Sequence, residues 1–176
     1  MTMTLIETKT LGTAASAIEF TSIPQTYTDL VFLVSARSSN TGAVYDNLFI
    51  TVNGTSSGYS ERLLYGDGSA TGSVAEALTR FRFFYTTTFS TTSNTFGNGQ
   101  LYIPNYAGAT NKSMSSESVA ENNGTSSLQS ITAHLWSNSA AITTVRFALD
   151  VGNLVVGSTI SLYGILKGSD GIVTVS

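Results

Sequence analysis

The sequence contains no cysteine and only one histidine among its 176 residues. Without cysteine, a chain has no disulfide scaffold, zinc finger, iron–sulfur site or thiol nucleophile. A single histidine also excludes a metal site built from several histidines of one chain. We therefore expect a protein that carries neither a cofactor nor a metal centre.

Charge is scarce as well. Charged residues make up 11% of the chain, against about a quarter in typical soluble domains. Eight basic and eleven acidic side chains give a net charge of −3, so no basic footprint for nucleic acid is expected. Instead, 51 residues are serine or threonine. Such a neutral surface is weakly repelled from its neighbours and suits a subunit of an assembly, although a low-charge extracellular domain would share this composition.

No segment has the pattern of a membrane span or a targeting signal. The most apolar stretch is Leu30–Val34, far shorter than the ~20 residues that cross a bilayer. The start, Met1–Glu7, has neither a basic region nor a long apolar run. We expect a protein that is made in the cytoplasm and has no membrane partner.

Runs rich in Thr, Val, Ile, Tyr and Phe alternate with clusters of Gly, Ser and Asn, which is the pattern of strands and turns. No ten-residue stretch has apolar residues at helical spacing, and Tyr59–Leu64 or Ser73–Leu78 is predicted to form at most one helical turn. The predicted strands are Leu5–Leu11, Ala17–Ile23, Thr28–Arg37, Asn47–Asn53, Leu78–Thr86, Gly99–Tyr106, Lys112–Glu121, Leu128–Trp136, Ile142–Asp150 and Thr159–Lys167, with a short last one at Ile172–Val175.

Several runs alternate between apolar and polar residues, as expected of a sheet with one face on a core. The sequence has no helices to connect parallel neighbours, so we predict an all-β fold: an antiparallel two-sheet sandwich, jelly-roll-like, in one domain spanning residues 1–176. An immunoglobulin-like sandwich is the alternative. The predicted inward sets are Leu48, Ile50 and Val52; Leu101 and Ile103; Ile131, Ala133 and Leu135; and Val145, Phe147 and Leu149.

Two predicted strands are apolar on both faces. Thr28–Arg37 carries Val31 and Leu33 opposite its inward set, and Thr159–Lys167 carries Tyr163 and Ile165. Strands of this kind are covered on both faces, here either by a loop of the same chain or by a second subunit. The polar stretch Thr86–Asn98 is predicted to be a mobile loop or an arm that a partner orders.

The sequence has no catalytic signature. A serine–histidine–acid triad would have to use His134, which the alternation places on an outward face, and no Gly-x-Ser-x-Gly motif occurs. Glu117 and Glu121 share one face of a strand but are ~13 Å apart, too far for a glycosidase pair. We therefore expect no catalytic residues and no enzyme activity.

What remains is a set of aromatic and arginine side chains on predicted outward faces. Aromatic residues and arginine on a surface poor in lysine and glutamate match the composition of interface cores. The same residues could instead form a second apolar layer under long loops, or stack on sugar rings. These candidate interface or glycan contacts are Phe49, Arg80, Arg82, Phe84, Tyr102, Tyr106, His134 and Trp136.

Three segments, Phe20–Arg37, Tyr102–Ser113 and Gly157–Ile165, resemble a family of small β-sandwich virion proteins of tailed phages of aquatic bacteria, cyanophages among them. The resemblance implies a phage virion structural protein, and first a capsid decoration (cement) protein that clamps the major capsid protein. Decoration proteins commonly sit on local threefold axes, which implies a homotrimer. Other members look like tail or fibre parts, so the alternative is a tail, baseplate or fibre domain that binds host-surface glycan.

Overall fold

The structure is a computed structural model that describes residues 2–124 and 127–166, apart from the side chains of residues 2, 83 and 84. In this part of the chain no helix is long and apolar enough to cross a membrane. The strand predicted at Ile172–Val175 lies outside the described residues. The described strands are β1 (Thr2–Thr10), β2 (Ala17–Phe20), β3 (Asp29–Ala36), β4 (Tyr45–Val52), β5 (Tyr59–Gly66), β6 (Thr71–Leu78), β7 (Phe81–Thr87), β8 (Gly97–Ile103), β9 (Lys112–Ala120), β10 (Leu128–Trp136), β11 (Val145–Leu149) and β12 (Thr159–Leu166).

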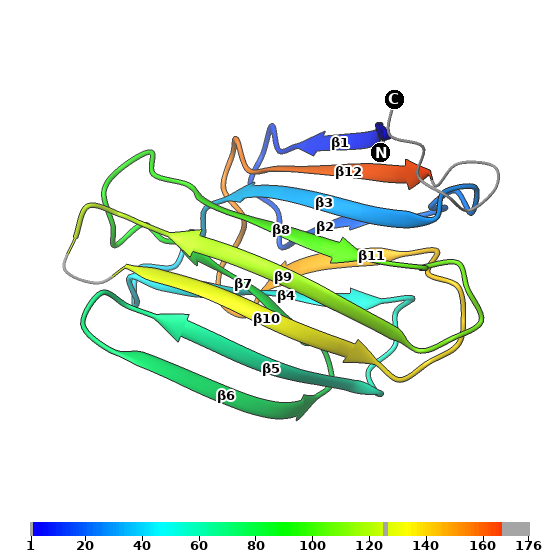
Figure 1. Cartoon of the computed structure of the whole chain (residues 1–176). Coiled ribbons are helices and arrows are strands. Elements are labelled where there is room, and N and C mark those ends of the chain that lie inside the picture. Colours follow the sequence, from blue (N-terminus) through cyan, green and yellow to red (C-terminus); the bar gives the residue numbers. More distant parts are fainter. Residues whose placement is uncertain (1, 125–126, 167–176) are drawn as a thin grey trace.

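These strands form two antiparallel sheets that pack face to face (Figure 1). The large sheet has eight strands in the order β1-β12-β3-β8-β9-β10-β5-β6, and the small sheet has four in the order β2-β11-β4-β7. The predicted all-β antiparallel sandwich is therefore confirmed.

The topology is a jelly roll with two insertions. Four nested pairs, β1 with β12, β2 with β11, β3 with β8 and β4 with β7, lie alternately in the large and the small sheet. This is a long hairpin folded over on itself, the jelly-roll arrangement. The hairpin β5–β6 is inserted between β4 and β7, and β9–β10 between β8 and β11. The inserted hairpins pair through β5 and β10 and widen the large sheet to eight strands.

The core lies between the sheets where the sequence predicts it. Leu48, Ile50 and Val52 of β4 are fully buried, as are the predicted inward residues of β8. The rings of Phe20, Phe32 and Phe147 meet edge to face or tilted, with centroids 5.2–6.3 Å apart. Alternation therefore predicts the inward face correctly for strands that pack directly on the opposite sheet.

The hairpin β5–β6 corrects the sequence analysis, which gave Tyr59–Leu64 and Ser73–Leu78 at most one helical turn. Both segments are strands, and they pair along their whole length. The turn between them is closed by the Asp67 carboxylate, which accepts backbone N–H groups of Ser69 at 2.9 Å and Ala70 at 2.7 Å. Pairing with β5 outweighs the helix propensity of the Ala-Glu-Ala-Leu run in β6.

The connection between β7 and β8, residues 88–96, is held by the chain itself. The buried Arg37 guanidinium donates hydrogen bonds to the carbonyl oxygens of Thr91, Thr92 and Thr95, at 3.2, 2.7 and 3.0 Å. The predicted connection is present, and these carbonyl oxygens are bonded within the chain rather than left free. The sequence did not identify Arg37 as its anchor.

The outward apolar residues of β3 and β12 are mostly covered within the chain. Val31 is 4% exposed and Ile165 3%, while Tyr163 is half-buried and Leu33 is 38% exposed. Val31 lies in register between Tyr163 and Tyr102 on the neighbouring strands. Of the two alternatives, cover by the same chain is correct for Val31 and Ile165, and only Leu33 stays exposed.

Candidate functional site

A cluster of buried polar side chains lies where the inserted hairpins meet β7. β7 is an edge strand of the small sheet, so one side of its backbone has no strand partner. The Arg82 N–H donates instead to Glu61 Oε2 of β5 at 2.9 Å, and the Tyr85 N–H to Ser118 Oγ of β9 at 3.4 Å. Side chains on the inner face of the large sheet thus accept hydrogen bonds from two backbone N–H groups of β7.

This role reverses the predicted orientation of β10. Alternation predicted Ile131, Ala133 and Leu135 to point inward, but Ile131 is 61% exposed. His134 and Trp136 point inward and are 2% and 0% exposed. The inner face of β10 carries polar side chains that bond to Ser116 and Ser118 of β9 within this cluster, and so its alternation misleads.

Within the cluster, Ser116, His134 and Glu61 stand in the order of a hydrolytic triad. Ser116 Oγ lies 2.8 Å from His134 Nε2, and His134 Nδ1 lies 3.8 Å from Glu61 Oε2. A serine, an imidazole and a carboxylate in this order activate the hydroxyl for acyl transfer when substrate can reach it. The second distance is too long for a hydrogen bond.

Burial controls the protonation of this group. It raises the pKa of the Glu61 carboxyl, against the opposing effects of the Arg82 backbone N–H and the Arg82 charge. It lowers the pKa of His134 to about 4, so the imidazole is uncharged at neutral pH. The Phe81 ring packs on the imidazole, with centroids 4.8 Å apart.

The triad-like group is sealed in the interior. Ser116, His134 and Glu61 are 4%, 2% and 1% exposed, so no substrate carbonyl touches the hydroxyl in this arrangement. No group of three histidine, aspartate or glutamate side chains among the described residues is placed to hold a metal ion. The arrangement is suited to holding β7 against the inserted hairpins, with buried polar groups that specify one register.

Some buried polar atoms of this cluster have no hydrogen-bond partner among the described residues. Glu61 Oε1, His134 Nδ1, Thr132 Oγ1 and Trp136 Nε1 are buried without a hydrogen-bond partner. An unpaired buried polar group costs roughly 1–3 kcal/mol. We therefore expect protonation and substitution in this cluster to change the stability of the fold.

The predicted contact residues do not form one surface. Tyr106 and Trp136 are fully buried core residues, so placing them on outward faces was wrong. Phe49 is also buried, under the Arg80 guanidinium at 3.7 Å from its ring centre. Tyr102 does face outward, half-buried.

The remaining predicted contacts are tied to partners or lie outside the description. The Tyr102 hydroxyl donates to Asp29 at 2.9 Å. Arg80 pairs with Asp150 at 2.7 Å, and Arg82 with Glu76 at 3.2 Å. The side chain of Phe84 lies outside the described residues. The predicted set is therefore spread over both sheets and the core.

Exposed apolar side chains gather at one end of the sandwich, on or beside the connections β3–β4, β7–β8 and β11–β12. We call this surface the apolar loop end; in Figure 1 it lies opposite the chain termini. Backbone hydrogen bonds join the three connections, Phe89 N–H to Asn40 O at 3.0 Å and Val155 N–H to Arg37 O at 3.0 Å. Its exposed residues are Val44 (36%), Tyr45 (37%), Phe89 (54%), Val151 (54%) and Val156 (56%).

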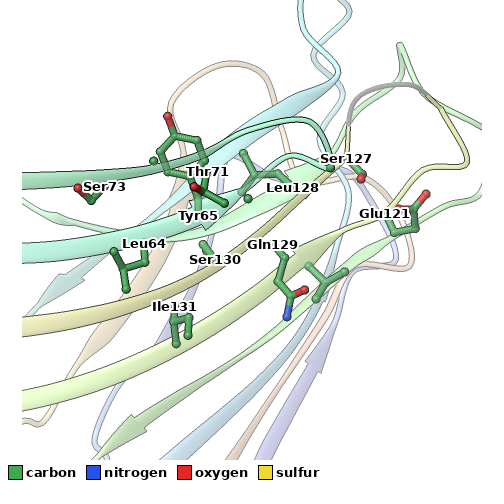
Figure 2. Close-up of a pocket in the computed structure, with 14 residues that line it drawn as sticks. Leu64, Tyr65, Thr71, Ser73, Glu121, Ser127, Leu128, Gln129, Ser130 and Ile131 are labelled. Carbon is green, nitrogen blue, oxygen red and sulfur yellow. The ribbon is translucent and has the colours of Figure 1, made fainter.

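A second surface is the outer face of the large sheet, on which none of the described strands packs as a second layer. Over the inserted hairpins this face is hollowed, with a volume of about 850 Å³. Figure 2 shows Leu64, Ile131 and Gln129 projecting from β5 and β10 to the same side, with Glu121 and Ser127 at the far end of the hollow. Leu64 is 59% and Ile131 61% exposed, so the hollow has an apolar floor open to solvent.

Sequence reasoning missed Glu61, the apolar loop end and the hollow. Glu61 lies before Arg62 in a run that does not alternate between apolar and polar residues. Nothing in the sequence therefore marks Glu61 as a buried residue. Phe89 in a serine- and threonine-rich loop was a usable signal, because a lone large aromatic in a polar loop is either anchored or exposed for binding.

Comparison of this chain with known protein families, with curated proteins and with solved structures gives no match. Its function is therefore argued from the sequence and these two surfaces.

Proposed function

We propose that this chain is a structural subunit of a phage virion, and first a capsid decoration protein that binds the major capsid protein. The resemblance of Phe20–Arg37, Tyr102–Ser113 and Gly157–Ile165 to small virion proteins supports this assignment. The observation that carries it is the apolar loop end, because exposed apolar side chains that gather on one surface are typical of protein-binding sites.

The apolar loop end is suited to docking because it is ordered before binding. Arg37 fixes the β7–β8 connection through three carbonyl oxygens and lies 5.7 Å from the Phe89 ring. A preorganised surface loses less conformational entropy on binding than a mobile one. Many identical copies, each burying a modest patch across neighbouring shell subunits, would reinforce a shell without any chemistry.

The copy number of the chain in purified particles tests this proposal. Quantitative mass spectrometry against the major capsid protein should give on the order of hundreds of copies per particle, as repeated docking on a shell requires. A few copies per particle would place the chain in the tail and overturn the assignment.

Docking itself is tested by binding the purified chain to particles that lack it. Phe89→Ser and Val156→Ser should each weaken binding, because each removes an exposed apolar contact. Leu5→Ser is the matched control, since Leu5 is 53% exposed on the edge strand β1. Equal binding by all three variants contradicts docking through the apolar loop end.

The hollow on the outer face favours a second candidate, a tail or fibre domain that binds neutral glycan. The Gln129 amide and the hydroxyl residues Thr71 and Ser73 line it beside Leu64 and Ile131, a mixture that suits sugar hydroxyls and C–H faces. A glycan array tests this candidate. Binding that Gln129→Ala abolishes supports it, and absence of binding counts against it.

A further inference from the structure

The outer face of the large sheet carries two exposed charges of opposite sign. Among the described strand residues, the charged side chains on this face are Asp29, Arg62 and Glu117. Asp29 is buried and accepts hydrogen bonds from the Tyr102 hydroxyl and the Asn105 N–H. Arg62 and Glu117 are exposed, and neither forms a salt bridge with a described residue. Within the strands that the structure describes, the face therefore offers one cation and one anion without an ion-pair partner, although Arg62 donates a hydrogen bond to the Glu61 carbonyl oxygen at 2.8 Å.

These two residues are placed symmetrically about the middle of β10. Glu117 of β9 is in register with Ile131, and Arg62 of β5 is in register with Ala133. With strands ~4.8 Å apart and a rise of ~3.3 Å per residue, their Cα atoms are about 12 Å apart. Their midpoint falls between Ile131 and Ala133. A two-fold axis that runs parallel to the sheet over this point, at right angles to the line between the two Cα atoms, places each charged position over the opposite one of the second copy.

We propose that two copies of this chain form a two-fold symmetric dimer through these outer faces, with Glu117 of each copy paired to Arg62 of the other. A two-fold contact is isologous: when residue i meets residue j, j also meets i, so one such axis makes both ion pairs at once. Facing sheets pack ~10 Å apart, a gap that a glutamate and an arginine side chain span together.

The side chains around the axis also suit contact with a second copy of the chain. Ile131, 61% exposed, would meet its copy close to the axis, and Leu64, 59% exposed, would be buried beside it. The neighbouring outward residues Ala75, Ser115 and Ala133 are small, so the two backbones can approach. With the axis at β10, the two sheets overlap over about five strands, β8, β9, β10, β5 and β6. These strands present roughly 600 Å² per copy, at the low end of the size of specific interfaces.

This inference does not rest on the proposed virion function, because it concerns the isolated chain in solution. It also differs from the homotrimer that the family resemblance implies. A two-fold contact gives a dimer of about 37 kDa, twice the 18.5 kDa of one chain, and a trimer would have about 56 kDa, three times that mass. The mass in solution separates the two.

The test is sedimentation equilibrium of the full chain over a range of concentrations, with charge reversals. The wild type should sediment as a dimer in equilibrium with a monomer. Glu117→Arg or Arg62→Glu alone should weaken dimerisation about tenfold or more, because each turns two attractions into two repulsions. The double variant Glu117→Arg/Arg62→Glu should restore the wild-type affinity.

Glu19→Arg and Arg146→Glu are the matched control reversals. These two residues are exposed cross-strand neighbours on β2 and β11 of the small sheet, and reversing them should leave dimerisation unchanged. A monomeric wild type, a trimer, or a dimer that Glu117→Arg does not weaken overturns the proposal. The dimer proposal is also overturned if the chain stays monomeric and its hollow binds a neutral oligosaccharide.

Discussion

Acid should weaken this fold through one buried imidazole. His134 is the only histidine and Trp136 the only tryptophan of the chain, so the titrating group and an optical probe lie in the same buried cluster. The perturbation is a fall in pH from 7 to 4, applied to the wild type and to Glu61→Gln. In that variant the amide oxygen of glutamine can still accept the Arg82 N–H.

The magnitude follows from the pKa of His134, about 4 in the folded chain against 6.5 for a free imidazole. Between these values the unfolded chain binds a proton that the folded chain does not, so stability falls as the pH falls. The difference of about 2.5 pKa units corresponds to about 3 kcal/mol. Below pH 4 both states are protonated and this loss stops.

Titration of Glu61 changes the free energy of unfolding with pH in the opposite direction. The Glu61 carboxyl therefore has to be replaced before the full effect of His134 can be measured. Burial raises the pKa of Glu61 above 4.5, so the folded chain keeps a proton that the unfolded chain has already released. That contribution falls as the pH rises above 4.5, and it offsets part of the His134 effect in the wild type. Glu61→Gln does not titrate, so it exposes the full dependence on His134.

The assay is urea unfolding followed by Trp136 fluorescence at pH 7, 6, 5 and 4. The free energy of unfolding of Glu61→Gln should fall by about 3 kcal/mol more than that of Glu61→Gln/His134→Phe, which controls for the other carboxylates. NMR of the single imidazole should show titration near pH 4. Equal pH slopes in the two variants, or a folded-state titration near 6.5, would refute the reasoning.

Three further substitutions test the packing. Arg37→Met should cost about 2–3 kcal/mol in urea unfolding and speed hydrogen exchange in residues 88–96, because three carbonyl oxygens lose a charged donor; unchanged exchange would show that the loop has another anchor. Gly164→Ala should cost about 1–3 kcal/mol because its Cβ would collide with the Tyr27 ring, and this cost should largely disappear in a Tyr27→Ala background. Thr132→Val should raise the free energy of unfolding by about 1 kcal/mol, since it removes a buried hydroxyl without a partner; a loss would imply that the hydroxyl is satisfied.

The jelly roll was predictable because its strands pack directly on one another. β4, β8 and β11 each bury an alternating apolar set against the opposite sheet, so a two-residue period predicts their inward faces. On β10 the same reasoning is wrong. Its inner face carries His134 and Ser130, which bond Ser116 and Ser118 of the neighbouring strand β9 inside the polar cluster.

The two exposed surfaces were less accessible to sequence reasoning because they depend on which strands meet. β5 and β6 show no alternation that distinguishes them from a helical turn, and their place beside β10 follows from pairing far along the chain. Arg62 and Glu117 share a face only through this pairing. Tyr106 and Trp136 were predicted to be outward contacts, but Tyr106 in the β8–β9 connection and Trp136 at the end of β10 are fully buried in the core.

We propose that the apolar loop end docks this chain on a shell. The most direct test of this claim is a high-resolution reconstruction of the intact particle in which this chain is traced. The predicted result is an array of copies over the capsid, with Val44, Phe89 and Val156 against the major capsid protein and the β1 edge away from it. Copies confined to the tail, or capsid copies whose apolar loop ends face solvent, would contradict the claim.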